Sequence, residues 1–331
     1  MPSIAIPSIL DRVARAGEAG VAYPEAGCDR DDLELCKTWG IRFEISERRV
    51  RLAFDHDQLV PAWIADETPA ISWERLQVEG FFETPSTNEV ALLRAGQRAA
   101  SGTLIYAESQ TAGRGRKGRQ WFSPVRTGLY FSLILRPEQA PSRWALLTHT
   151  ASAALAFALQ EIVQEGLASR PLDLELKWPN DVLLSGKKTA GILLETAGTG
   201  GTISAAVVGV GVNVSRALLP AELQDQVTSI SEATGVQAPR RHLLVRFLYH
   251  FQLGYDLFVR GEHEAILDQW KKFSHMWSDT PVWIIENDQA RPAVTAGLTE
   301  SGALMVRTPD GAEEVILAGD VSVRRSAREE R

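Results

Sequence analysis

The chain of 331 residues has very little cysteine, with only Cys28 and Cys36, eight positions apart near the N-terminus. Two cysteines at this spacing build neither a disulfide framework nor a zinc-binding pattern, so we expect a reducing, cytoplasmic location. The six histidines show no HxH or HExxH spacing. The sequence therefore predicts no metal bound by protein side chains.

Long hydrophobic runs are also missing. No stretch reaches the roughly 18 consecutive apolar residues of a membrane-spanning helix, and the N-terminus lacks a basic segment followed by a long apolar one. We therefore expect neither a membrane span nor a signal peptide. Basic charge is not in excess either, because the formal net charge is −7. That charge argues against a surface built for non-specific binding of nucleic acid.

Signatures of two common enzyme classes are absent as well. The chain contains neither a G-x-S-x-G turn nor a G-x-x-x-x-G-K-[ST] loop, so a serine hydrolase or a P-loop NTPase has no support. What is present is ordinary for a globular enzyme, with 44% hydrophobic and 23% charged residues. This composition excludes wholesale disorder and a fibrous repeat.

Residues 1–66 form an acidic region, with 8 basic and 12 acidic residues and a net charge of −4. Their pattern outlines a small, degenerate winged-helix-like module, in which residues 17–41 hold only Arg30 and Lys37 as basic residues. Such a helix has little to offer to DNA phosphates. The predicted elements are helices over 8–16 and 32–38, strands over 42–45 and 49–54, and a linker over 62–69.

Residues 67–275 alternate helical and β-type patterns in the manner of an α+β domain, and residues 276–331 hold only short β-type runs. The predicted helices are 86–100, a long amphipathic helix that Ser142 caps and that ends near 165, 239–260 and 263–273. The predicted strands are 103–109, 128–135, 172–178, 181–184, and a hairpin of 191–196 with 203–210. The runs 281–285, 293–299, 304–308, 314–317 and 321–324 predict a small antiparallel barrel or sandwich.

The stretch from Gln110 to Trp121 reads QTAGRGRKGRQW. Its glycines satisfy GxGxxG, yet the loop leads into a strand, whereas a dinucleotide-binding loop opens a helix. The glycines permit close backbone approach, and the cations between them supply donors for phosphate or carboxylate. Four cations in six residues repel one another, so we expect this loop to be mobile until an anion binds. A solvated basic loop or a nucleic-acid patch explains the composition equally well.

A second informative stretch is KWPND at 177–181, followed by KKTAGILLE at 187–195. Because Pro179 cannot lie inside a helix, Asn180 and Asp181 are predicted to begin a strand. A Ser-Gly turn then lets a hairpin return Lys188 to the side of Asp181. Such a pair is either a structural ion pair or a catalytic one.

Two shorter motifs have ordinary structural explanations as well as functional ones. Ser86-Thr87-Asn88 stands at a predicted helix start, where these residue types cap helices. Asn213 ends the apolar run GVGVN at 209–213, and it is a ligand candidate only if that strand end faces a cleft.

Together these segments resemble one family, the biotin–protein ligases, also called biotin–[acetyl-CoA-carboxylase] ligases. The resemblance covers roughly residues 80–325 and rests on STN, GRGRKGRQW, KWPND, KKTAGILLE and GVGVN in the family's order and spacing. It implies an α+β fold with a mixed-sheet biotin/lipoate ligase-like catalytic domain over 67–275. A C-terminal SH3-like β-barrel over 276–331 and the winged-helix-like module over 1–66 complete the implied organisation.

The resemblance implies a reaction in two steps. Biotin attacks the α-phosphate of ATP, which arrives with Mg²⁺, and the biotinyl-5′-AMP formed passes its acyl group to a carrier lysine. The implied catalytic residues are Lys188, Arg116 and Asp181, the last orienting or helping to deprotonate the lysine amine. The implied biotin-binding residues are Ser86, Thr87, Asn88, Gln110, Gly113, Arg114, Gly115, Arg116, Lys188 and Gly191. The implied ATP-binding residues are Arg116, Arg119, Trp121, Asn180 and Asn213.

The implied partner is the biotin carboxyl carrier domain of acetyl-CoA carboxylase or of another biotin-dependent carboxylase, and no prosthetic group is implied. A homodimer is left open, while a membrane partner and specific DNA binding are not expected. The alternative function is a biotinyl-AMP-sensing repressor of biotin synthesis, which some family members are. A transferase of lipoyl or octanoyl groups shares the catalytic fold, but GRGRKGRQW and the β-type C-terminal region argue against it.

Overall fold

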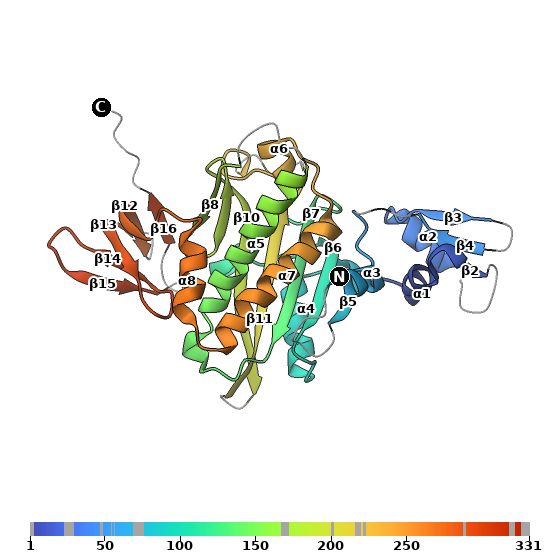
Figure 1. The fold of residues 1–331 in the computed structure, drawn as a ribbon, viewed down its shortest axis with the longest axis horizontal. Coiled ribbons are helices and arrows are strands. Elements are labelled where there is room, and N and C mark those ends of the chain that lie inside the picture. The colour runs from blue at the N-terminus through green and yellow to red at the C-terminus, as the bar shows by residue number, and fades with distance from the viewer. Residues whose placement is uncertain are drawn as a thin grey trace.

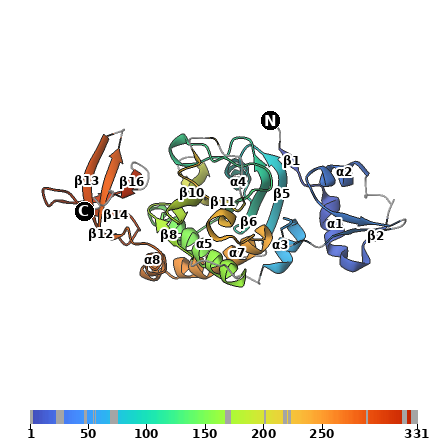
Figure 2. The same cartoon turned by 90° about the horizontal axis from the view of Figure 1, so that it is seen from above.

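A computed structural model places a helix-covered sheet between two smaller β-containing parts, one from each end of the chain (Figure 1). The N-terminal and C-terminal parts lie on opposite sides of the sheet in both views (Figures 1 and 2). The structure describes residues 3–22, 30–46, 49–53, 55, 57–68, 76–166, 172–199, 202–215, 220, 223–286, 289–317 and 322–325.

The central sheet has eight strands in the order β1-β5-β6-β7-β11-β10-β9-β8. Its neighbours pair antiparallel except β5 and β6, which run parallel, so the sheet is mixed as predicted. Two of its strands, β1 and β5, were not predicted from the sequence. The bounds are β1 Ile4–Ala5, β5 Gln77–Thr84, β6 Thr103–Gln110, β7 Gly128–Leu135, β8 Leu174–Lys177, β9 Asp181–Leu184, β10 Lys187–Thr199 and β11 Thr202–Asn213.

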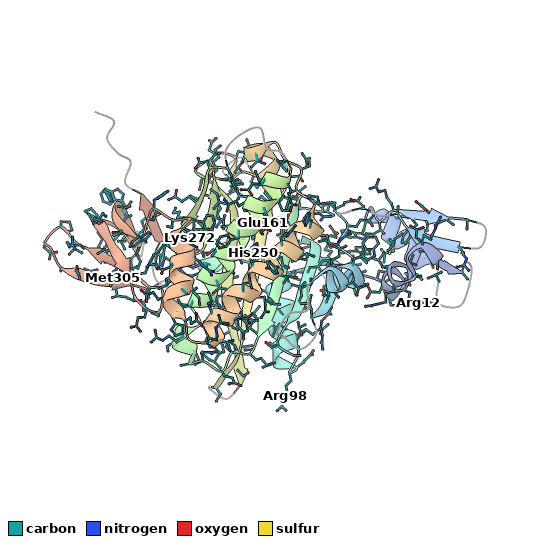
Figure 3. The ribbon with its side chains drawn as sticks, in the orientation of Figure 1. Arg12, Arg98, Glu161, His250, Lys272 and Met305 are labelled. Atoms are coloured by element: carbon teal, nitrogen blue, oxygen red, sulfur yellow. The ribbon has the colours of Figure 1, made fainter. Side chains whose placement is uncertain are left out.

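Helices cover both faces of this sheet (Figure 2). On one face lie α5 (Leu146–Glu165), α7 (Arg240–Val259) and α8 (His263–Lys271), and on the other lies α4 (Thr87–Gly96). Between α5 and α7, the Nε2 of His250 lies 3.0 Å from the Oε1 of Glu161 (Figure 3). A short helix, α6 (Ile230–Thr234), follows β11 and begins with a capping box at Ser229.

The helix α5 begins later than the sequence suggested. Ser142 belongs to a 3₁₀ turn over Pro141–Arg143, and the N-cap position of α5 is Ala145, which has no side-chain cap. The prediction of Ser142 as N-cap was wrong because Ser142 lies inside the 3₁₀ turn that Pro141 begins, ahead of α5. One helical stretch, Pro141–Glu165, has the length and hydropathy of a membrane span, but 78% of its most apolar window is buried inside the protein. It is the core helix of this domain.

Successive residues of β11 point alternately into two hydrophobic cores, one on each face of the sheet. Its even-numbered residues, such as Val208 and Val210, pack with α5 and α7, while Ala205 and Val207 pack with α4 in a second cluster. Successive side chains of a strand point to opposite faces, and both faces of this strand are covered. The α4 face continues along β11 as Gly209, which has no side chain to fill the space.

The N-terminal part combines α1 (Ser8–Ala16) and α2 (Arg30–Thr38) with a three-stranded sheet in the order β2-β4-β3. These strands are β2 Val21–Ala22, β3 Phe43–Ile45 and β4 Arg49–Leu52. The linker predicted over 62–69 is instead a helix, α3 (Pro61–Glu67), with residue 69 outside the described residues. Pro61 has the backbone angle that a first helical turn needs, and Ile64 is fully buried, so helix formation also buries apolar surface.

A buried ionic cluster joins this part to the central sheet. The Arg240 side chain is 2% exposed; its Nη1 lies 2.5 Å from Glu108 on β6 and its Nη2 lies 3.0 Å from Asp57. Burial opposes the charge of Arg240, but Glu108 and Asp57 outweigh burial and raise its pKa above the usual value. Next to it, the fully buried Arg241 binds Glu67 of α3 at 3.0 Å. Asp57 and Glu67 of α3 are therefore held in place by α7.

The C-terminal part is a five-stranded antiparallel sheet in the order β15-β14-β13-β12-β16, as its β-type pattern predicted. It docks through its β13–β14 turn, where the O of Gly302 accepts a hydrogen bond of 3.1 Å from the indole of Trp178. The same turn packs on His149, whose pKa burial lowers to about 4, so this imidazole is neutral at neutral pH. The strands are β12 Ser278–Glu286, β13 Gln289–Leu298, β14 Leu304–Arg307, β15 Glu313–Ile316 and β16 Ser322–Arg325.

Replacing Glu108 with alanine should lower the free energy of unfolding by about 3 kcal/mol, because Arg240 would stay buried without its closest carboxylate. The matched control is Glu79→Ala, which breaks a half-exposed pair with Arg94 and should cost about 1 kcal/mol or less. Urea denaturation of both variants measures the difference. Equal losses would contradict the role given to the buried cluster.

Candidate functional site

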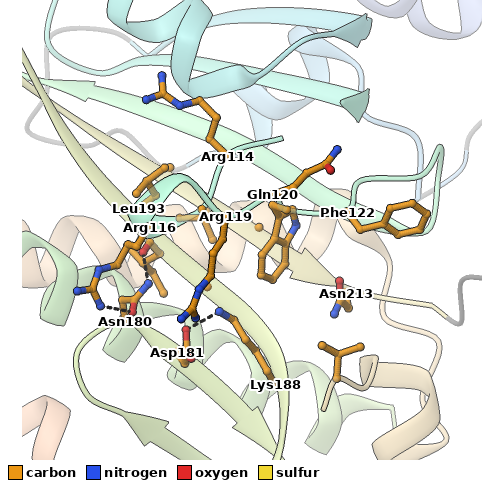
Figure 4. A pocket seen from close by; sticks show the side chains of 18 of the residues that line it. Arg114, Arg116, Arg119, Gln120, Phe122, Asn180, Asp181, Lys188, Leu193 and Asn213 are labelled. Carbon is orange, nitrogen blue, oxygen red and sulfur yellow. Dashed lines mark hydrogen bonds and ion pairs between the residues drawn. The ribbon is translucent and has the colours of Figure 1, made fainter. Parts of the chain in front are cut away.

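A cavity of about 630 Å³ opens on the α4 face of the sheet, beyond the start of α4 (Figure 4). Five parts of the chain surround it: the start of α4, the β6–β7 loop, the β8–β9 connection, the cavity-facing side of β9 to β11, and the segment after β11. Its lining includes Ser86, Thr87, Asn88, Gln110, Arg114, Gly115, Arg116, Arg119, Trp121, Asn180, Asp181, Lys188, Gly191 and Asn213. The structure thus brings together every site residue predicted from the sequence except Gly113.

Gly113 begins the basic loop and lies outside the lining of the cavity. A Cβ at this position would contact the carbonyl oxygen of Trp121 too closely, and the Gly113 oxygen accepts a hydrogen bond of 2.8 Å from the Trp121 amide. Its visible role is therefore to let the two arms of the loop approach, which places Trp121 at the cavity.

The floor of the cavity is hollow because three glycines of β10 and β11 face it. A Cβ on Gly211 would lie 2.5 Å from the indole nitrogen of Trp121, and a Cβ on Gly191 would lie 3.2 Å from its ring. A Cβ on Gly209 would overlap the amide of Asn88. The indole and the amide therefore occupy space that any other residue on this strand face would fill.

Lys188 and Asp181 form the ion pair that the hairpin pattern predicted. Strands β9 and β10 pair antiparallel, and the Lys188 Nζ lies 2.6 Å from Asp181 Oδ1, with both side chains less than one-third exposed. The Lys188 ammonium also lies 5.3 Å from the centre of the Trp121 ring, within range of a cation–π contact. The lysine is thereby directed into the cavity, with Asp181 as its counterion.

The basic loop is held by its own backbone and by the cavity wall. The Gly115 amide donates to the Arg119 oxygen at 2.7 Å, and the backbone turns through Arg116–Gly118. The Nη1 of Arg116 donates to Asn180 Oδ1 at 3.0 Å, while its Nη2 is buried and has no hydrogen-bond partner among the residues that the structure describes. Figure 4 shows Arg116 directed at Asn180 and Arg119 directed toward the Lys188–Asp181 pair.

Burial lowers the pKa of the Arg116 guanidinium below its usual value, opposed by Asp181 and aided by Arg119. An arginine remains charged at neutral pH even so. A desolvated cation with an unused donor has a large electrostatic gain available from an anion that enters the cavity. This end of the cavity therefore favours negatively charged ligands.

A network of uncharged hydrogen bonds forms the other end. The Gln110 Oε1 accepts from the Thr87 amide at 2.8 Å, and its Nε2 donates to Ser123 at 2.8 Å. Ser132 donates to Asn88 Oδ1 at 2.5 Å. Ser86, Thr87 and Asn88 do stand at the start of α4 as predicted, with Ser86 at the N-cap position, yet its side chain makes no capping bond.

The sequence analysis did not predict three features that shape the site: Ser132, Glu195 and the two glycines of GVGVN. Ser132 carries a signal, because it is the one polar residue in the fully buried strand GLYFSLIL apart from the tyrosine hydroxyl. The two glycines could also have been recognised from the sequence, because they alternate with valines in an apolar run and therefore lie on one face of the strand. Glu195 follows an apolar run without any pattern that separates it from a surface residue.

The chemistry available here is that of an anion site with a polar pocket beside it. Arg116, Arg119 and Lys188 direct positive charge into the cavity, and Asp181 is its only carboxylate among the described lining residues. Fixed cations of this kind stabilise charge that develops on phosphate or carboxylate oxygens. Trp121 offers an aromatic surface, and Asn213, whose Nδ2 donates to the Thr228 oxygen at 3.2 Å, offers an amide at the far edge.

Comparison with known families identifies two segments. A model of the biotin/lipoate A/B protein ligase family matches residues 81–213, which span the cavity strands and the basic loop. A model of the biotin protein ligase C terminal domain matches residues 291–324, within the five-stranded sheet.

Individual relatives cover more of the chain. The bifunctional ligase/repressor BirA of Salmonella typhimurium is 32% identical over 240 residues, which are 72% of each chain. The biotin–[acetyl-CoA-carboxylase] ligase of Mycobacterium tuberculosis is 32% identical over 283 residues, covering 85% of this chain and 88% of that protein. The solved structure of Aquifex aeolicus biotin protein ligase in complex with biotin and ATP superposes with a TM-score of 0.64. It has 29% identity and covers 76% of this chain and 99% of that chain.

Replacing Gly211 with alanine should displace the Trp121 indole, because the new Cβ would lie 2.5 Å from its nitrogen. In protein labelled with 5-fluorotryptophan, the fluorine resonance of Trp121, assigned with Trp121→Phe, should shift and broaden. Gly96→Ala is the matched control, since a Cβ there meets nothing within 4 Å. A Trp121 resonance that moves no more in Gly211→Ala than in the control would refute the packing argument.

Proposed function

Because the chain belongs to the biotin protein ligase family, we propose that this cavity binds biotin and ATP side by side and joins them. The chain is a biotin ligase: it activates biotin as biotinyl-5′-AMP and transfers the biotinyl group to a carrier lysine. The observation that supports this assignment of the cavity is one cluster of cations, Arg116, Arg119 and Lys188, at the end of a neutral polar pocket.

The first step needs these cations. A carboxylate oxygen of biotin attacks the α-phosphorus of ATP, a P–O bond forms, and pyrophosphate leaves with the electrons of the broken P–O bond. Two anions must approach each other, so their repulsion has to be offset by fixed positive charge in a site with little water. We assign Lys188 to the attacking carboxylate and the α-phosphate oxygen, and Arg116 to the charge that grows during transfer.

The neutral end suits the biotin head. Ser86, Thr87, Asn88 and Gln110 supply donors and acceptors of the kind that a ureido group pairs with, and the network around them is already ordered. We propose that these residues, with the backbone of Gly115 and Gly191, form the biotin pocket. Arg114 closes it from the loop, and Gly113 acts by shaping that loop. Pre-ordered hydrogen-bonding groups bind a ligand at a lower entropic cost.

The opposite edge suits the nucleotide. Trp121 offers its ring as an apolar surface, and Asn180 and Asn213 offer amides on either side of the cations. We propose that Arg119, together with these three residues, holds ATP with its α-phosphate near Lys188. The buried Arg116 Nη2, which has no partner in the described part of the chain, is a donor available to that phosphate.

In the second step the ε-amine of the carrier lysine attacks the acyl carbon of biotinyl-5′-AMP, the amide bond forms, and AMP leaves. We propose that Asp181 accepts or orients the amine proton, because its carboxylate is the acidic group at the reaction centre. The carrier is, on this proposal, the biotin carboxyl carrier domain of acetyl-CoA carboxylase or of a similar carboxylase.

Magnesium enters this proposal as part of the ATP substrate. No group of three or more His, Cys, Asp or Glu side chains suited to a metal ion occurs among the residues that the structure describes. The single carboxylate of the described lining, Asp181, is engaged by Lys188. The phosphates themselves would hold the ion, whose charge would join that of the arginines at the leaving pyrophosphate.

The repressor alternative receives little support from the N-terminal part. Of its three clustered arginines, Arg48 lies outside the described residues, while Arg51 pairs with Glu18 at 2.9 Å and with Glu44 at 3.3 Å. Arg49 donates to the carbonyl oxygen of Ala19. Cations already used inside the module add little to phosphate binding. We propose that residues 1–66 serve the catalytic unit over 67–275, with β1 and α3 as the joint, and that the enzyme acts in the cytoplasm.

Lys188→Ala should reduce the formation of biotinyl-5′-AMP by a factor of about a hundred or more, equivalent to roughly 3 kcal/mol, because the reacting anions would lose their nearest cation. Pyrophosphate release with biotin, ATP and magnesium measures this step. Lys187→Ala, one residue earlier and exposed, is the matched control and should keep full activity. Activity of Lys188→Ala within about tenfold of the parent would overturn the assignment.

The full chain should select no DNA sequence from a pool of random duplexes at about 0.15 M salt, with or without biotin and ATP. The reason is the acidic N-terminal part and the internal pairing of Arg51. Sequencing after repeated rounds of selection is the measurement, with carrier biotinylation followed by mass in the same preparation. An enriched motif that depends on biotin and ATP would restore the repressor function.

A further inference from the structure

Glu195 is the last residue of the KKTAGILLE segment, and its carboxylate bridges the two sides of the cavity mouth. Its Oε2 accepts a hydrogen bond of 2.9 Å from Asn88, and its Oε1 lies 2.7 Å from the Arg114 guanidinium. Asn88 and Arg114 line the cavity, while Glu195 does not belong to its described lining. Any effect of Glu195 on a ligand must therefore pass through these two neighbours.

The sheet side of the bridge is rigid. Asn88 is 4% exposed, its Oδ1 accepts from the fully buried Ser132, and Gly209 leaves the space in which its amide fits. Glu195 itself stands on β10 opposite Val207 of β11. A carboxylate that receives one hydrogen bond from so fixed an amide has a defined position, and its other oxygen meets Arg114 of the loop.

The loop side of the bridge is Arg114. The bonds between Gly115 and Arg119 and between Trp121 and Gly113 are internal to the loop and do not fix it to the sheet. Two loop arginines reach the walls of the cavity with their side chains: Arg116 binds Asn180, and Arg114 binds Glu195. Figure 4 shows Arg114 directed away from the Lys188–Asp181 pair, on the other side of the loop from Arg116.

From this geometry we infer that Glu195 is a positioning residue that holds the basic loop closed over the biotin end of the cavity. It does so by neutralising Arg114 and aligning it with Asn88. The inference rests on the proposed function for what the pocket binds. It divides the loop cations into two groups: Arg114 fastens the loop, while Arg116 and Arg119 remain for the reacting anions. A carboxylate is needed for this, since a neutral amide would keep the size but not the charge.

The test compares Glu195→Gln with Glu79→Gln, which removes a carboxylate from a pair of similar exposure with Arg94, outside the cavity. Glu195→Gln should raise the KM for biotin about tenfold and leave kcat within about twofold. Proteinase K should cut residues 112–120 several times faster in Glu195→Gln than in the parent, without ligand, as located by mass. Glu79→Gln should match the parent in both measurements.

Arg114→Gln breaks the same pair from the exposed loop and should reproduce the faster cleavage, which keeps the test valid if Glu195→Gln does not fold. Adding Glu195→Gln to Arg114→Gln should then raise the KM for biotin no further. Unchanged KM and cleavage in Glu195→Gln, or additive effects in the double variant, would overturn the inference. A parent chain that fails to biotinylate any carrier would refute the proposed function instead, because the cleavage comparison needs no ligand.

Discussion

Three glycines on one face of the β10–β11 hairpin, Gly191, Gly209 and Gly211, are the constraint on which the cavity depends. A strand covered on both faces normally fills both, and β11 does so with Ala205 and Val207 beneath α4. Two residues farther along, the same face changes to Gly209 and then Gly211, while the opposite face continues as Val210 and Val212 in the main core. The strand therefore remains anchored by one face at the very place where the other opens.

That arrangement explains why the site can be both hollow and well ordered. The space above the glycines is occupied by parts of other elements: the Asn88 amide from α4 and the Trp121 indole from the loop. Each is fixed by the same close approach that excludes a Cβ beneath it. Rigid, interlocking polar groups lose little entropy when a ligand binds, so the available binding energy can go to orientation.

The sequence predicted those parts of the molecule in which local pattern and tertiary structure agree. The helix over 8–16, the strand over 128–135 and the pairing of Lys188 with Asp181 follow from hydrophobic period and turn chemistry, and each is confirmed. The linker over 62–69 failed because its short, mixed composition hides a helix that becomes stable only when Ile64 and Glu67 find partners in the core and in Arg241. Ser142 failed because a proline-initiated turn starts the helix without a side-chain cap.

The cavity itself shows a deeper limit of sequence reasoning. Motifs named most of its lining because several functional residues lie close together in the chain, as in 113–121 and 177–181. Glu195 and Ser132 were not found, because their importance comes from Asn88, which is more than 40 residues away from each. Asn88 contacts both only after β7 and β10 have taken their places in the sheet.

The same sheet also supplies one partner of the buried ionic cluster, because Glu108 lies on β6, two residues before Gln110. A buried ion pair contributes little net stability against an apolar pair of the same size, but it accepts only one geometry. Arg240 therefore sets the position of β6 relative to α7 and Asp57, and with it the end of β6, from which Gln110 reaches Thr87.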